Sequence, residues 1–175
     1  MRPSELALGI AANTAVFSVA DAVLFRPLPY QSPEQLVLLD EVIPRFTSMY
    51  PSLPVNAKHF LEWQANARSF SGMSILRDGA VNLTGNDGPP ERLGVENASA
   101  DLFPVLGVQP LLGRNFSAAE DRPGNNRIVI LTEQLWRRRF HSDPGILNKS
   151  ILLDGVPNQV IGVLRRPSIF RDRIY

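Results

Sequence analysis

Residues 6–25 read LALGIAANTAVFSVADAVLF, the only long apolar run in the chain, and no lysine or arginine interrupts it. A helix of this length rises about 30 Å, which matches the hydrocarbon core of a bilayer. Four polar side chains lower its hydropathy, namely Asn13, Thr14, Ser18 and Asp21. The stretch therefore predicts a membrane helix of moderate hydrophobicity, with everything after it tethered outside the bilayer.

Small side chains recur along this predicted helix at intervals of three or four residues. They form one stripe, made of Ala7, Ala11, Ala15, Ser18 and Ala22. In lipid, a stripe of small residues lets another helix approach closely, and hydroxyl groups can hydrogen-bond across the contact. We therefore interpret this stripe as a packing face for partner helices.

Two other interpretations of the stretch remain open. An alanine-rich amphipathic helix could lie in a soluble core, or the run could be the apolar region of a cleaved signal peptide. Arg2 before the run and Ala20 near its end fit a signal peptide, whereas Glu5 and Asp21 argue against it. The charges that flank the run do not fix its orientation.

The composition of the chain narrows the classes of function. A net charge of +1 gives no electrostatic argument for nucleic-acid binding. The absence of cysteine excludes disulfides, thiolate nucleophiles and cysteine-ligated zinc. Hydrophobic content of 44% and charged content of 20% are typical of a globular domain, and the 15 prolines indicate many short elements.

The remaining pattern predicts an α+β fold of short strands and helices. Strands are expected over residues 35–43, 72–84, 90–98, 127–131, 150–153 and 159–164, and helices over 55–70, 101–106 and 133–140. Asn56 and Thr132 are expected N-caps, and Gly107 is placed to end the middle helix. Ser117 and Glu120 have the spacing of a capping box that begins a single helical turn.

Aromatic side chains recur at helical spacing in the first and last of these helices. We interpret them as core residues and not as a ligand site, namely Phe60, Trp63, Phe70, Trp136 and Phe140.

Catalytic, cofactor and metal motifs are not found in the sequence. It contains no phosphate-binding loop, no G-x-S-x-G and no H-E-x-x-H. His59 and His141 are isolated, so they are interpreted as surface side chains. Glu120 and Asp121 are adjacent and cannot face one site on a helix. Residues 137–139 are three arginines that could contact lipid headgroups or an acidic partner, but a solvated helix face is the favoured interpretation.

Several sequence blocks, in order, resemble a known family. The first is residues 6–30, LALGIAANTAVFSVADAVLFRPLPY, followed by 60–73, FLEWQANARSFSGM. Next come residues 97–116, NASADLFPVLGVQPLLGRNF, then EDRPG, IVILTEQLWRRRF and finally LLDGVPNQVIGV at 152–163. Together they resemble the MacB-like periplasmic core domain of FtsX-like ABC-transporter permeases, over residues 6–164.

The resemblance implies a membrane helix and exit segment over residues 1–30, a mixed α/β, porter-like periplasmic domain over 31–164, and an unmatched tail over 165–175. It implies a protein of the bacterial inner membrane with its main domain in the periplasm. The implied partners are the lipid bilayer, the remaining permease helices, a separate ATP-binding subunit and a second permease copy in a dimer. The implied role is mechanical, with no catalysis and no cofactor.

Family members of this kind carry a longer segment before the LALG block and three further membrane helices after the periplasmic domain. We therefore expect a truncated permease subunit of an efflux or transport system. The alternative function is a secreted periplasmic binding module released by signal-peptide cleavage.

Overall fold

The computed structural model describes residues 30–85, 88–165 and 173–174. The predicted membrane helix over residues 6–25, with its stripe of small residues, lies outside the described residues. Within the described ranges, no helix has the length and hydropathy needed to cross a bilayer.

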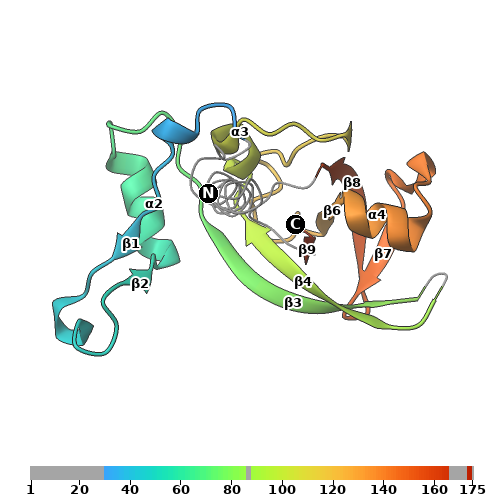
Figure 1. The fold of residues 1–175 in the computed structure, drawn as a ribbon, viewed down its shortest axis with the longest axis horizontal. Coiled ribbons are helices and arrows are strands. Elements are labelled where there is room, and N and C mark those ends of the chain that lie inside the picture. The colour runs from blue at the N-terminus through green and yellow to red at the C-terminus, as the bar shows by residue number, and fades with distance from the viewer. Residues whose placement is uncertain (1–29, 86–87, 166–172, 175) are drawn as a thin grey trace, which may run out of the picture.

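A mixed seven-stranded sheet forms the larger part of the fold (Figure 1). Along the sheet the strands are β5 (Leu112–Gly113), β8 (Val156–Leu164), β7 (Ser150–Leu153), β3 (Leu76–Thr84), β4 (Glu91–Ala98) and β9 (Arg173–Ile174). A further strand, β6 (Ile128–Thr132), pairs parallel to β8, and β9 pairs parallel to β4. The other pairs in this sheet are antiparallel; β3–β4 and β7–β8 join consecutive strands, whereas β3–β7 and β5–β8 join strands far apart in sequence.

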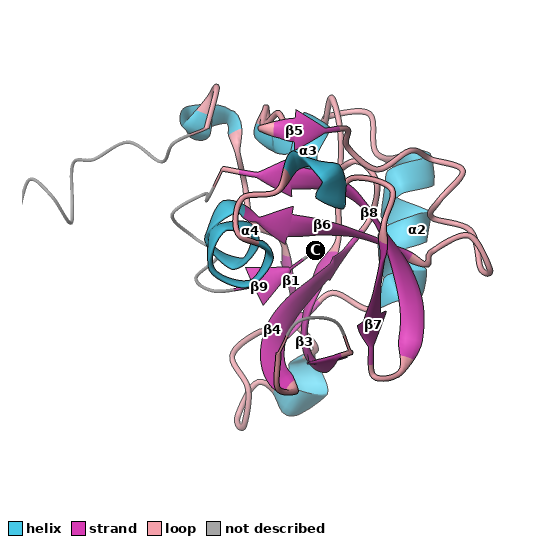
Figure 2. Ribbon diagram, turned by 90° about the vertical axis from the view of Figure 1, so that its right-hand side faces the viewer, coloured by secondary structure: helices cyan, strands magenta, loops and turns pink. Residues whose placement is uncertain are grey.

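Two short helices pack on the strands of this sheet (Figure 2): α4 (Glu133–Phe140) and α3 (Leu102–Leu106). Side chains of β6 alternate between two core clusters, because successive residues of a strand point to opposite faces. Val129 and Leu131 belong to the cluster that contains Leu135 and Trp136 of α4. Ile130 belongs to the cluster that contains α3. The central strands therefore contribute buried side chains to both hydrophobic clusters.

Tight turns with positive backbone angles join the antiparallel strands. Asp154 (φ 50°) and Gly155 (φ 75°) form the two-residue turn between β7 and β8. The Asp154 carboxylate accepts hydrogen bonds from the backbone and side-chain N–H groups of Asn82 at 2.9 and 2.8 Å. The turn is thereby fixed to β3.

Residues 30–73 form a smaller part of the molecule, here called the lobe, at the left of Figure 1. Its elements are the 3₁₀ turns η2 (Pro33–Gln35) and η3 (Pro44–Phe46), the strands β1 (Asp40–Glu41) and β2 (Leu53–Pro54), and helix α2 (Ala57–Asn66). The strands β1 and β2 pair antiparallel as a separate two-stranded sheet. The seven-stranded sheet with α3, α4 and the 3₁₀ turn η4 (Pro144–Ile146) is called the body.

The structure confirms most of the elements expected in the body and several of the caps. Asn56 accepts a hydrogen bond from Lys58 N–H at the start of α2, and Thr132 accepts one from Leu135 N–H at the start of α4. Gly107 ends α3 with a φ of 66°. The hairpin of β3 and β4 and that of β7 and β8 are both present.

Two local expectations are wrong. The strand expected over residues 35–43 is paired only at Asp40–Glu41, because its partner β2 is two residues long and includes a proline, which has no N–H to donate. Helix α2 ends at Asn66, because the backbone is already extended at Ala67 (φ −70°, ψ 130°), and Phe70 lies outside it with 40% of its surface exposed. The single turn expected after Ser117 is present, because Glu120 N–H donates to the Ser117 carbonyl at 2.9 Å and Ser117 N–H donates to the Glu120 carboxylate at 2.8 Å.

Gly113 shows how closely β5 crosses β8. It has a φ of +77°, and a Cβ added there would lie 2.1 Å from the carbonyl oxygen of Ile161. Gly155 has a similar φ of +75°, but an added Cβ would meet nothing within 4 Å. Of these two glycines, only Gly113 combines a left-handed backbone with a steric clash for an added side chain.

We expect Gly155→Ala to lower the free energy of unfolding by about 1 kcal/mol, the usual cost of a left-handed alanine. Gly113→Ala should lower the free energy of unfolding by several times this amount, because β5 must also move away from β8. Urea unfolding followed by circular dichroism measures both variants. Equal losses would show that β5 is not held against β8 as described.

Candidate functional site: the α3 junction

Helix α3 lies where the lobe meets the body. Leu102 and Phe103 are buried among Ile130, Ile161 and Leu164. The Phe103 ring also packs on Phe116, with 5.7 Å between the ring centroids. We call residues 99–107 and their polar partners the α3 junction.

Side chains of the lobe contact this junction directly. The Gln64 side-chain amide of α2 donates to the Asp101 carboxylate at 3.3 Å and to the Met73 carbonyl at 3.5 Å. Gly107 lies against Gln31, so that an added Cβ would come within 2.6 Å of the Gln31 Cβ. The lobe is therefore in contact with both ends of α3.

The body holds the other side of the junction. Ser99 N–H donates to the Ile75 carbonyl at 3.0 Å, and Ile75 N–H donates to the Ser99 hydroxyl at 3.2 Å. The Ser74 and Ser99 hydroxyls are 2.9 Å apart. The Asp121 carboxylate accepts from Ala100 N–H at 2.8 Å, one residue before Asp101. The entry into α3 is thus fixed to residues 74–75, directly before β3, and to the loop that carries Asp121.

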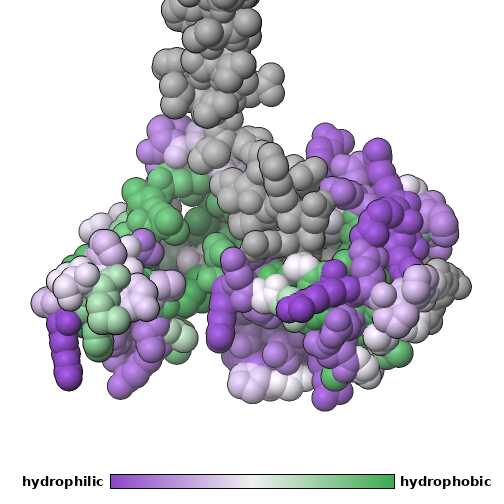
Figure 3. Space-filling model, turned by 60° about the horizontal axis from the view of Figure 1, so that its bottom comes forward, coloured by the Kyte–Doolittle hydropathy of each residue, from purple (hydrophilic) through white to green (hydrophobic). Residues whose placement is uncertain are grey.

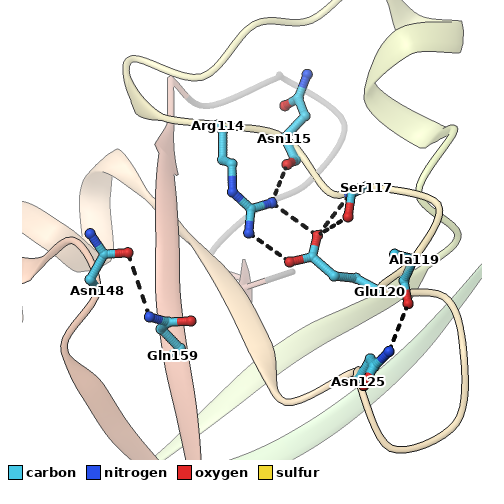
Figure 4. A network of polar contacts seen from close by, with 8 residues as sticks. All are labelled: Arg114, Asn115, Ser117, Ala119, Glu120, Asn125, Asn148 and Gln159. Atoms are coloured by element: carbon cyan, nitrogen blue, oxygen red, sulfur yellow. Dashed lines mark hydrogen bonds and ion pairs between the residues drawn. The ribbon is translucent and has the colours of Figure 1, made fainter.

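An ion pair orders the loop that carries Asp121 (Figure 4). Arg114 and Glu120 form a two-point contact, with N–O distances of 2.6 and 2.9 Å. Ser117 donates to Glu120 from its N–H and from its hydroxyl, both at 2.8 Å. Asn125 donates to the Ala119 carbonyl at 3.2 Å. These contacts hold the loop that places Asp121 against α3.

The same contacts shift the pKa values of the pair. The Arg114 hydrogen bond, with smaller contributions from the Ser117 N–H and hydroxyl, lowers the pKa of Glu120 from its ordinary 4.5 to about 2. The hydrogen bond to Glu120 raises the pKa of Arg114. Glu120 is therefore a charged structural group at neutral pH. Asp121 faces a different partner, so the two adjacent carboxylates do not share a site.

The arginine run of α4 holds the turn end of the β3–β4 hairpin. Arg138 pairs with Glu91 of β4 at 2.5 Å, and Arg139 donates to the Pro89 carbonyl at 2.8 Å. Arg137 pairs with Glu133 within α4 at 2.7 Å. Arg137 and Arg138 are 66% and 53% exposed, as expected of a solvated helix face. The contacts with residues 89–91 are not visible in the sequence.

The two histidines have structural contacts. His59 Nδ1 lies 2.6 Å from a Glu41 carboxylate oxygen, which also accepts from Asn56 N–H at 3.2 Å. This contact joins β1 to the start of α2, where the helix dipole favours a carboxylate. His141 is the left-handed residue that ends α4. Among the residues that the structure describes, no three histidine or acidic side chains are grouped to hold a metal ion.

The predicted core aromatics have different degrees of burial. Phe60 and Trp136 are buried, at 6% and 9% exposure, and the Trp136 ring N–H donates to the Asp143 carbonyl at 2.9 Å. Phe140 is half-buried against the core of the body. Trp63 is also half-buried, and Phe70 is exposed.

The order of motifs and the fold point to the same family. The MacB-like periplasmic core domain matches residues 6–175. The chain belongs to this family. The matched range also includes residues 165–175, so the tail lies inside the family match and not outside it as expected. Residues 99–107 of the α3 junction lie within the block NASADLFPVLGVQPLLGRNF, which is part of the resemblance.

Solved structures with this fold come from transporter proteins. The periplasmic region of MacB from Actinobacillus actinomycetemcomitans matches with a TM-score of 0.58 at 16% identity, over 74% of this chain and 58% of that one. The extracellular domain of the noncanonic ABC-type transporter YknZ from Gram-positive bacteria matches with a TM-score of 0.57 at 15% identity, over 74% of this chain and 65% of that one. The chain thus spans less than two thirds of either relative. No curated protein sequence matches it.

The Glu120 pKa predicts a pH dependence of stability. Because the folded-state pKa is lowered, the contact stabilises the fold fully above pH 4.5, and the stabilisation is lost as the pH falls towards 2. Glu120→Gln should cost about 1 kcal/mol at pH 7, since Arg114 is half exposed, and should weaken the acid dependence in that window.

Urea unfolding between pH 2 and 7 measures this effect. Ser117→Ala serves as a graded control, because it removes one hydroxyl donor and keeps the arginine pair. The stability of Ser117→Ala and its dependence on pH should lie between those of the parent chain and those of Glu120→Gln. If Glu120→Gln unfolds with the same acid dependence as the parent chain, Glu120 is not the group whose lowered pKa stabilises the fold.

Proposed function

We propose that the chain is the periplasmic mechanical part of a permease subunit in an ABC-type transporter. In this proposal residues 6–25 cross the inner membrane, and the stripe from Ala7 to Ala22 packs on further permease helices. A separate ATP-binding subunit drives the motion, and a second permease copy completes a dimer. The family match supports the proposal, because the family is a transporter domain and not a class of enzyme.

The α3 junction gives this role a structural basis. A chain that leaves a membrane helix enters the lobe first, since residues 30–73 follow directly on the predicted helix and its exit segment. The lobe contacts the body through Gln31 and Gln64, at the two ends of α3. Phe103 fixes α3 in the core of the body. We propose that displacement of the lobe is passed to the body through these contacts.

The described side chains support a mechanical role over a chemical one. The acidic residues of the junction act as hydrogen-bond acceptors for backbone and amide N–H groups. The buried interior consists almost wholly of apolar side chains. Such an arrangement can transmit force through packed contacts.

A distance measurement in the assembled transporter tests the proposal. The chain has no cysteine, so Met49→Cys in the lobe and Val156→Cys in the body, both exposed, give two unique spin-label sites. We expect the distance between them to change when a non-hydrolysable ATP analogue binds the assembly. The control pair Leu76→Cys and Val156→Cys lies wholly in the body and should keep its distance. If the first pair also keeps its distance, the mechanical role is wrong.

A further inference from the structure

Asp101 occupies the N-cap position of α3 but does not cap this helix. An N-cap aspartate normally accepts a hydrogen bond from the backbone N–H of the second or third helical residue. In α3 the third residue is Pro104, which has no N–H, and the Asp101 side chain makes no capping hydrogen bond. Its carboxylate instead accepts from the Gln64 side chain of the lobe at 3.3 Å. The sequence of α3 thus leaves this carboxylate available to a group outside the helix.

The contact between Gln64 and Asp101 is easily broken. The Gln64 side-chain amide lies 3.3 Å from the Asp101 carboxylate and 3.5 Å from the Met73 carbonyl, and both distances are long for hydrogen bonds. Both Gln64 and Asp101 are exposed. Water therefore offers each group an equivalent hydrogen bond when they separate, so that the net contribution of the contact to stability is small.

Apolar burial does not add to this contact. In the described part of the chain, both hydrophobic clusters consist of residues of the body. Leu61 on α2 and Phe70 after it are 62% and 40% exposed. Figure 3 shows apolar surface on the lobe, whereas most of the visible surface of the body is hydrophilic. Two parts of a chain without a large apolar interface are expected to move relative to one another.

Residues 67–71 connect α2 to the body without a helix or strand, and all five are exposed. Beyond them, Gly72 lies against Val105 of α3, since an added Cβ would come within 2.9 Å of a Val105 methyl group. Ser74 and Ile75 then contact Ser99 by hydrogen bonds. Exposed backbone with few buried contacts changes conformation at low cost in free energy. Residues 67–71 are therefore suited to act as a hinge between two better-fixed ends.

We propose that Gln64 and Asp101 form a releasable latch between the lobe and the body. The lobe is docked on α3 while the contact holds, and it turns about residues 67–71 when the contact breaks. The inference rests on the proposed function and adds the contact that regulates it. The strength of this contact sets the fraction of molecules in which the lobe is docked, and so how much of the lobe displacement reaches α3.

Charge at position 64 should change the docked fraction in opposite directions. Gln64→Lys places a cation opposite the Asp101 carboxylate, whereas Gln64→Glu places a second carboxylate there. We expect the ratio of docked to released molecules to rise about threefold in Gln64→Lys and to fall about threefold in Gln64→Glu, the size typical of exposed charge pairs. Because both residues are exposed, neither substitution disturbs the core.

Spin-label distances in the full chain, without the ATP-binding subunit, measure this ratio. Labels at Met49→Cys in the lobe and Val156→Cys in the body should give two populations of distances, whose proportions shift as stated. Ala65→Lys and Ala65→Glu are the matched controls. Ala65 is exposed and lies one residue further along α2, about 100° around the helix from Gln64. Its variants should leave the proportions unchanged.

A double substitution tests whether Asp101 is the partner. Gln64→Glu together with Asp101→Asn exchanges the amide and the carboxylate, so the docked fraction should return towards that of the parent chain. A single population of distances in every variant, a shift in the same direction for Gln64→Lys and Gln64→Glu, or no recovery in the double variant would each overturn the latch. These outcomes leave the proposed function standing, because its test is the response of the parent residues at 64 and 101 to the ATP analogue in the assembly.

Discussion

The burial of Phe103 is the contact on which the arrangement of the molecule depends. Its side chain is fully enclosed by residues of β6 and β8, and burying a side chain of this size contributes about 2–3 kcal/mol. Because α3 is only five residues long, it has little stability of its own and exists through this packing. Gln64 and Gln31 of the lobe contact the helix that Phe103 holds in place. The position of the lobe therefore follows from the core of the body.

The two parts of the molecule differ in how completely they are stabilised. The body has two apolar clusters on its central strands, and its loops are fixed by charged contacts such as Arg114–Glu120 and Arg138–Glu91. The lobe has a two-stranded sheet, one buried aromatic side chain on α2 and a long exposed apolar segment. The proposed mechanical role makes use of this combination. The rigid part resists deformation, and the less covered part is available to partners.

Sequence reasoning predicts the elements whose signals are local. The caps at Asn56 and Thr132 and the left-handed end at Gly107 follow from residue type and spacing. The contacts that define the α3 junction, and those of α4 with the β3–β4 hairpin, are not predictable in this way. Asp121 is 21 positions from Ala100, and Glu91 is 47 positions from Arg138. The segment 35–43 was predicted as a strand because its composition is that of a strand, but pairing also requires a partner. The described part of the chain supplies that partner at only two residues.

Hydrogen exchange on Phe103→Leu tests most directly whether α3 links the lobe to the body. The substitution keeps the site apolar but removes the ring that packs on Phe116. We predict faster exchange of the backbone amides in both α3 and α2, with the amides of β7 unchanged, since Ile151 of β7 belongs to the other core cluster. Faster exchange in α3 with no change in α2 would contradict it, because the lobe would then be independent of the junction.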